Sequence, residues 1–136
     1  MDKLHEALNL YWNSKSFRPL QKEVISNYLM AKDTVVLMPT GGGKSICYQL
    51  PALLSDGLTL VISPLISLMQ DQVDQLNQRG IKSMFFESNR GENDIDRQFE
   101  NARNGGFKLI YSSPERLVNR SFLEQLKNLN IVGIAV

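Results

Sequence analysis

The chain has little of what marks membrane, secreted or fibrous proteins. Its 136 residues include a single cysteine, Cys47, so no internal disulfide can form. The longest near-continuous apolar stretch, residues 58–69, is much shorter than the roughly 20 residues that a membrane-spanning helix needs. The first residues lack the basic-then-apolar order of a signal peptide. These absences predict a cytoplasmic protein that has no membrane partner.

An excess of charge of either sign is also missing. The chain carries 15 basic and 14 acidic residues, for a net charge of +1, so bulk charge neither favours nor excludes a nucleic-acid partner. Hydrophobic residues make up 43% of the chain and charged residues 21%. That composition excludes intrinsic disorder and a coiled coil. The length is typical of one globular domain.

Helical and β-branched patterns alternate along the chain. Two helical patterns come first, followed by five short apolar runs that are expected to be strands: residues 34–37, 58–62, 83–86, 108–111 and 131–136. Helical patterns separate them, and Pro51 is expected to bend or end the first of these. The alternation predicts an α/β fold, a parallel sheet with helices on both faces. We expect a single domain over residues 1–136, with N-terminal helices in 1–33 and βα units in 34–136.

A glycine cluster follows the first expected strand. Residues 38–45 read Met-Pro-Thr-Gly-Gly-Gly-Lys-Ser and lead into an expected helix. Glycines let successive backbone N–H groups approach a phosphate, and the helix start adds further N–H groups. In such a loop the lysine reaches the β and γ phosphates and the hydroxyl ligates Mg²⁺. The pattern predicts a P-loop NTPase with Lys44 and Ser45 as catalytic residues, Ser45 as metal ligand, and nucleotide contacts at Met38, Thr40, Gly41, Gly42, Gly43, Lys44 and Ser45.

The acidic partner of such a loop is missing from its usual place. An NTPase needs a carboxylate at the end of another strand to hold Mg²⁺ and orient water. Only Glu87 follows one of the first four expected strands, and it lies in a polar loop. We therefore expect the domain to be truncated after the fifth strand, at Val136, and the chain to be catalytically inactive by itself. The alternative is a free-standing nucleotide-binding sensor or adaptor.

Five segments together resemble the RecQ-type ATP-dependent DNA helicases of superfamily 2. They are residues 17–21, 38–51, 63–69, 71–73 and 113–117, in the order that the family has them. The resemblance implies the N-terminal part of a first RecA-like motor domain that uses ATP and Mg²⁺. It also implies 3′→5′ unwinding of duplex DNA, in DNA repair and recombination. The same motor domain would continue with an Asp-Glu-Ala-His segment directly after Val136, and the remaining helicase domains would follow.

The same resemblance assigns residues 17–21 to adenine recognition. Gln21 would pair with the adenine, because a side-chain amide both donates and accepts hydrogen bonds. Arg18 would lie against the base or the ribose. Asn13 and Ser14 stand where the family has Gly-Tyr. Core packing of the N-terminal helices is the alternative role of Phe17.

A second pair of motifs resembles the family's contacts to single-stranded DNA. The residues concerned are Ser63, Pro64, Ser113 and Arg116. Hydroxyls, backbone amides at a helix start and an arginine can bind phosphates without reading sequence. The alternative for Ser63 and Pro64 is an ordinary strand-to-helix turn, with a serine cap and proline in the first turn.

Overall fold

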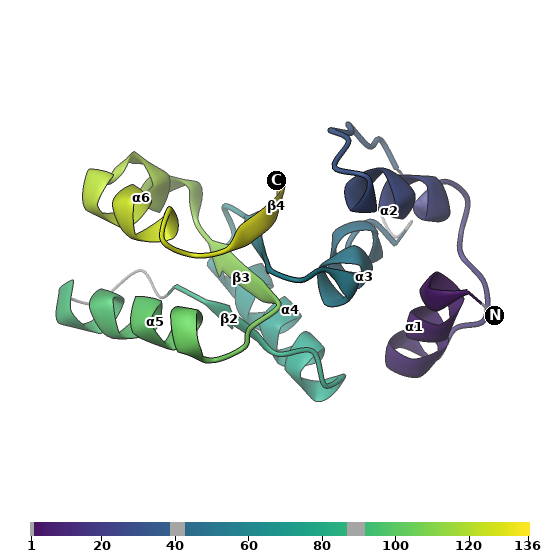
Figure 1. Ribbon diagram of the computed structural model, residues 1–136, viewed down its shortest axis with the longest axis horizontal. Helices are drawn as coiled ribbons and strands as arrows, with labels where there is room; N and C mark the ends of the chain where they lie inside the picture. The colour runs from purple at the N-terminus through teal and green to yellow at the C-terminus, as the bar shows by residue number, and fades with distance from the viewer. Residues whose placement is uncertain (1, 39–42, 87–91) are drawn as a thin grey trace. The chain divides into compact units, whose positions relative to one another are not determined.

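The computed structural model describes residues 2–38, 43–86 and 92–136 (Figure 1). The chain divides into two compact units, Met1–Ser55 and Asp56–Val136. The first contains α1 (Lys3–Trp12), α2 (Gln21–Leu29) and α3 (Ile46–Leu54). The second contains, in chain order, β1 (Leu58–Ile62), α4 (Ile66–Gln78), β2 (Ser83–Phe85), α5 (Glu92–Asn104), β3 (Leu109–Ser112), the short 3₁₀ helix η1 (Pro114–Val118), α6 (Arg120–Leu126) and β4 (Ile131–Ala135). No helix in the described ranges is both long and apolar enough to cross a bilayer.

The second unit is built on a parallel sheet with strand order β2-β3-β1-β4. Strand β1 lies between β3 and β4, and its last residue, Ile62, is opposite Ser112 of β3. Because the strands are parallel, their carboxyl ends meet at one edge of the sheet. The predicted α/β architecture is confirmed for this unit.

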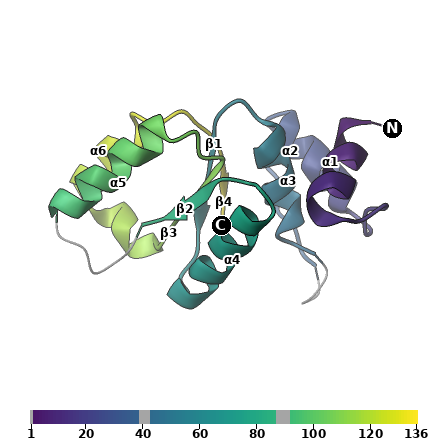
Figure 2. The same ribbon diagram turned by 90° about the horizontal axis from the view of Figure 1, so that it is seen from below.

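Helices cover both faces of this sheet (Figure 2). On one face, α5 and α6 enclose an apolar core around three phenylalanine rings, Phe86, Phe99 and Phe122, whose centroids are 4.7–5.1 Å apart. On the other face, α4 lies against β2 and β3 and buries Met69, Val73 and Leu76. Burial of side chains on both faces explains why the strands carry apolar residues without strict alternation.

The first unit has its own small core between its three helices. Ala7 and Leu8 of α1 pack with Ile25 of α2 and Leu50 of α3. Partly buried side chains surround them, among them Tyr11, Trp12, Phe17 and Ile46. Phe17 therefore packs against this core, as its alternative role predicts, and so does Trp12.

One local expectation is wrong. Residues 34–37 form no strand, and Val35 and Leu37 are 91% and 89% exposed, so the sheet has four strands among the described residues and Ile131–Ala135 is the fourth. β-branched residues favour an extended backbone, but a strand exists only where a neighbour completes its hydrogen bonds. Pro51 does not end α3, which continues to Leu54.

The end of α2 offers a test of backbone strain. Ala31 follows the helix with a φ of 57°, a left-handed conformation, while Lys32 N–H bonds to the Asn27 carbonyl at 2.8 Å. This conformation costs a residue with a Cβ about 1–2 kcal/mol, part of which is offset by the freedom of glycine in the unfolded chain. We expect Ala31→Gly to raise the free energy of unfolding by about 0.5–1 kcal/mol in urea titrations.

The same exchange within a helix provides the control. Ala7 lies inside α1 and is buried, so Ala7→Gly should lower the free energy of unfolding by about 1 kcal/mol. A loss of stability in Ala31→Gly comparable to that in Ala7→Gly would show that the left-handed conformation carries no strain.

Candidate functional site

One side-chain amide connects the two segments of the first unit that are predicted to bind nucleotide. Gln21, the first residue of α2, is only 2% exposed. Its Oε1 accepts a hydrogen bond from the backbone N–H of Arg18 at 2.8 Å. Its Nε2 donates to the carbonyl of Gly43 at 3.0 Å. The segment predicted to read adenine is thus joined directly to the end of the predicted phosphate loop.

This contact depends on the absence of a side chain at Gly43. Gly43 has a φ of +80°, and a Cβ there would lie 2.3 Å from the Gln21 Nε2. Leu20, just before Gln21, also has a positive φ, of 72°. Such a conformation is uncommon outside glycine and is found in places where the surrounding structure enforces it. The backbone therefore has a positive φ on both sides of the Gln21–Gly43 hydrogen bond, at Leu20 and at Gly43.

Lys44 and Ser45 lie where the sequence predicts, at the start of the helix after the loop. The carbonyl of Ser45 accepts a hydrogen bond from the N–H of Gln49 at 2.9 Å, in the first turn of α3. Lys44 is exposed, and the Ser45 hydroxyl forms no capping bond. An ammonium group and a hydroxyl are thus available at a helix N-terminus, a position that favours anions. Met38 is half-buried, whereas Thr40, Gly41 and Gly42 lie outside the described residues.

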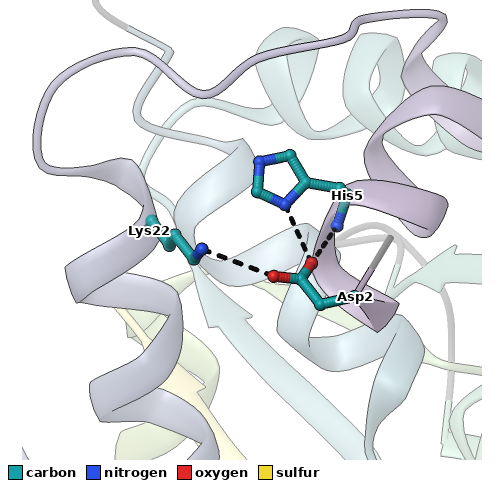
Figure 3. A network of polar contacts seen from close by, with 3 residues as sticks. All are labelled: Asp2, His5 and Lys22. Carbon is teal, nitrogen blue, oxygen red and sulfur yellow. Dashed lines mark hydrogen bonds and ion pairs between the residues drawn. The ribbon is translucent and has the colours of Figure 1, made fainter.

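A polar network holds the start of α1 beside α2 (Figure 3). Asp2 caps α1 by accepting the backbone N–H of His5 at 2.9 Å, and its carboxylate also contacts the His5 ring at 2.8 Å and Lys22 Nζ at 3.4 Å. The His5 ring meets the edge of Phe17, with centroids 5.0 Å apart. Hydrogen bonds from the His5 backbone and ring hold the pKa of the Asp2 carboxyl well below its usual range. Sequence reasoning missed this network, although an Asp three residues before His5 has the spacing of a helix cap.

In the second unit, the two motifs predicted to bind DNA meet at the carboxyl edge of the sheet. The N–H of Ser63, just after β1, donates to the carbonyl of Ser112 at 3.0 Å. A pocket of about 600 Å³ opens there, and Pro64, Ser113 and Arg116 line it. Ser63 lies beside it and accepts a hydrogen bond at 3.4 Å from the N–H of Leu65. Ser63 thus makes a hydrogen bond within the turn before α4 but does not cap the helix, whose N-cap residue is Leu65. Pro64 also lies outside the helix, which begins at Ile66.

Arg116 supplies the positive charge of this pocket. Its guanidinium lies 5.7 Å from the centre of the Phe122 ring. Partial burial lowers the pKa of Arg116, but a guanidinium stays charged in proteins. Ser113, in contrast, is only 7% exposed, so its contribution is limited to the small surface that lines the pocket. A charged arginine beside two strand ends can hold an anionic backbone.

Comparison with known sequences identifies the class of protein. The family described as DEAD/DEAH box helicase matches residues 18–135, nearly the whole chain. The chain belongs to this family. The four-stranded parallel sheet and its helices agree with the RecA-like fold that was predicted.

Individual relatives show which helicases within this family the chain is similar to. The chain is 44% identical over 131 residues to the ATP-dependent DNA helicase RecQ of Pasteurella multocida, and 47% identical over 130 residues to that of Haemophilus influenzae. It is 42% identical over 137 residues to the RecQ helicase of Bacillus subtilis. These alignments cover 96–98% of the chain and 21–23% of each relative, so the chain spans about a fifth of their length. The resemblance to RecQ-type helicases is confirmed.

The Asp2 network predicts a loss of stability in acid. Since its pKa is lowered in the folded state, the unfolded chain takes up the proton first, and stabilisation by the carboxylate is lost progressively below about pH 4. Asp2→Asn keeps a capping oxygen but has no charge to lose. We expect the melting temperature of the parent chain to exceed that of Asp2→Asn at pH 6, and the difference to shrink towards pH 2.

Asp33→Asn serves as the charge control, because Asp33 is exposed and lies outside the network. A difference between the parent chain and Asp2→Asn that stays constant from pH 6 to pH 2 would mean that the contacts of Asp2 do not stabilise the folded state.

Proposed function

We propose that this chain is the ATP-binding part of the first motor domain of a 3′→5′ DNA helicase, and that its two units belong to that one domain. The observation that carries the proposal is the Gln21 amide bonded to Gly43, directly before Lys44 and Ser45. It joins an adenine-reading segment to a phosphate loop, in a chain of the helicase family. That family membership also favours a helicase over a free-standing sensor.

In this proposal the phosphates of ATP bind at the start of α3. Lys44 neutralises the β and γ phosphates, and backbone N–H groups of residues 40–43 surround them together with Met38. Ser45 ligates Mg²⁺, for which its uncapped hydroxyl is suited. Mg²⁺ usually takes few protein ligands and completes its shell with substrate phosphates and water. Among the described residues no cluster of three or more His, Cys, Asp or Glu offers a separate metal site.

Adenine would bind by replacing contacts that Gln21 now makes within the protein. The Gln21 donor is engaged with the Gly43 carbonyl and its acceptor with the Arg18 N–H. Both atoms are needed to pair with an adenine amino group and ring nitrogen. Binding of the base would therefore release Gly43, so recognition of adenine and the shape of the phosphate loop are coupled.

DNA is the second proposed ligand. Ser63, Pro64, Ser113 and Arg116 would hold the phosphates of a single strand at the carboxyl edge of the second unit. Strand separation would then require the remaining helicase domains, since the chain corresponds to about a fifth of the length of its relatives. No described strand ends on a carboxylate, so we expect residues 1–136 to bind nucleotide without hydrolysing it.

Nucleotide binding can be tested by thermal melting with Mg-ADP, Mg-ATP and Mg-GTP. A ligand that binds only the folded state at a hundredfold excess over its Kd adds about 2.7 kcal/mol of stability. We expect a shift with the adenine nucleotides and little with GTP. Lys44→Ala should abolish most of this shift, whereas Lys32→Ala, which removes an exposed lysine outside the loop, should retain it. Equal shifts in the two variants would contradict the proposed role of Lys44.

The choice of base can be tested separately from affinity. A bidentate pair between an amide and a base contributes about 1–3 kcal/mol of discrimination, so Gln21→Ala should reduce the preference for ADP over GDP by about fivefold or more. The ratio of the two affinities, measured by titration calorimetry, is insensitive to an overall loss of stability. Asn9→Ala, an exposed amide on α1, should leave it unchanged. An unaltered ratio in Gln21→Ala would rule out base reading by this residue.

A further inference from the structure

The pocket at the carboxyl edge of the second unit extends beyond the residues assigned to phosphate contacts. Residues of α5 and α6 line much of the rest of it. These two helices lie side by side in both views (Figures 1 and 2). They contribute apolar surface from Ile95 and Phe122 and polar groups from Asp96 and Gln125. At about 600 Å³ the pocket is within the range of small-molecule sites and larger than a phosphate group requires.

The chemistry of these inner walls disfavours phosphate. Two carboxylates, Asp96 and Glu115, belong to the lining and would repel an anion. Ile66 and Ile95 offer apolar surface instead. The Arg116 guanidinium lies against the Phe122 ring, and a planar guanidinium is a surface on which nucleobases stack. A flat, uncharged heterocycle fits these walls better than a phosphate does.

The polar rim favours one kind of base. Oδ1 of Asp96 accepts a hydrogen bond from Nε2 of Gln125 at 3.1 Å, which fixes the carboxylate across α5 and α6. Within the described residues no hydrogen bond reaches the second oxygen of Asp96. A fixed carboxylate oxygen accepts from an exocyclic amino group, which adenine, cytosine and guanine carry. Thymine has a carbonyl oxygen in place of that group and would be repelled.

We propose that this pocket takes one unstacked base with an exocyclic amino group, from the DNA strand held at Ser63, Pro64, Ser113 and Arg116. The proposal rests on the proposed function, because it needs a bound single strand. Removing a base from its stack costs a few kcal/mol in a duplex but little in a single strand. Asp96 and Gln125 would give the DNA site a preference among bases that phosphate contacts cannot provide.

Fluorescence anisotropy at low ionic strength tests the proposal with labelled twelve-residue thymidine strands. The central position is thymine, adenine, cytosine, guanine or an abasic sugar, and the chain can shift along the strand to place that position in the pocket. We expect each strand with an amino base to bind about fivefold or more tighter than the thymine and abasic strands, the low end of what one stacked base contributes. Asp96→Asn and Gln125→Ala should remove this difference.

Two control variants separate the base pocket from DNA binding itself. Gln78→Ala removes an exposed amide from α4 outside the pocket lining and should preserve the preference. Arg116→Ala should weaken all five strands. If the strands bind equally well and only Arg116→Ala weakens them, the base pocket is overturned while the proposed DNA site stands. If no strand binds the parent chain, both are overturned.

Discussion

The pairing of β1 with β3 is the interaction on which the second unit depends. It brings together strands that are about fifty residues apart in the chain, with Thr59 opposite Leu109 and Ile62 opposite Ser112. The hydrogen bond from Ser63 to Ser112 extends this pairing by one residue. Parallel pairing therefore fixes the register, and the register places the segment after β1 next to the segment after β3. Without this strand pairing, the two segments predicted to bind DNA, one after β1 and one after β3, would not share a surface.

In the first unit a single side chain, Gln21, joins two segments that are distant in the chain. The helices of this unit share only a small core, so the position of Gly43 relative to residues 17–21 depends strongly on polar contacts. The Gln21 amide provides two of these, and it is almost completely buried. An amide that lost both partners in a buried site would cost about 1–3 kcal/mol for each unsatisfied group. The first unit is consequently sensitive to substitutions on either side of this contact.

The sequence was sufficient to predict features that depend on local pattern. Helical periodicity, the glycine cluster and the Ser-Pro segments located the helices, the loop and the strand ends. The sequence was insufficient where the local structure depends on contacts with residues that are distant in the chain. Residues 34–37 have the composition of a strand but no described neighbour, and the hydrogen bond from Gln125 to the exposed Asp96 joins residues that are 29 positions apart.

The Gln21 amide already makes two hydrogen bonds within the protein, and this affects how much adenine binding can contribute to nucleotide affinity. If adenine only replaced the Arg18 and Gly43 partners, the number of hydrogen bonds would remain nearly constant and the net gain would be small. Favourable binding must then come from interactions absent without nucleotide: the charge on Lys44, the metal at Ser45 and the backbone N–H groups around the phosphates. In the proposed function Gln21 would therefore act mainly in selecting the base, and the predicted phosphate loop would supply most of the affinity. Gly43 contacts Gln21 through its carbonyl and directly precedes Lys44 and Ser45. In the proposed function, a nucleotide without a γ phosphate and a nucleotide without adenine would therefore affect the conformation at Gly43 differently. Under the same proposal, residues 17–21 would contact the base and residues 43–45 the phosphates, and the Gln21–Gly43 hydrogen bond would link the two.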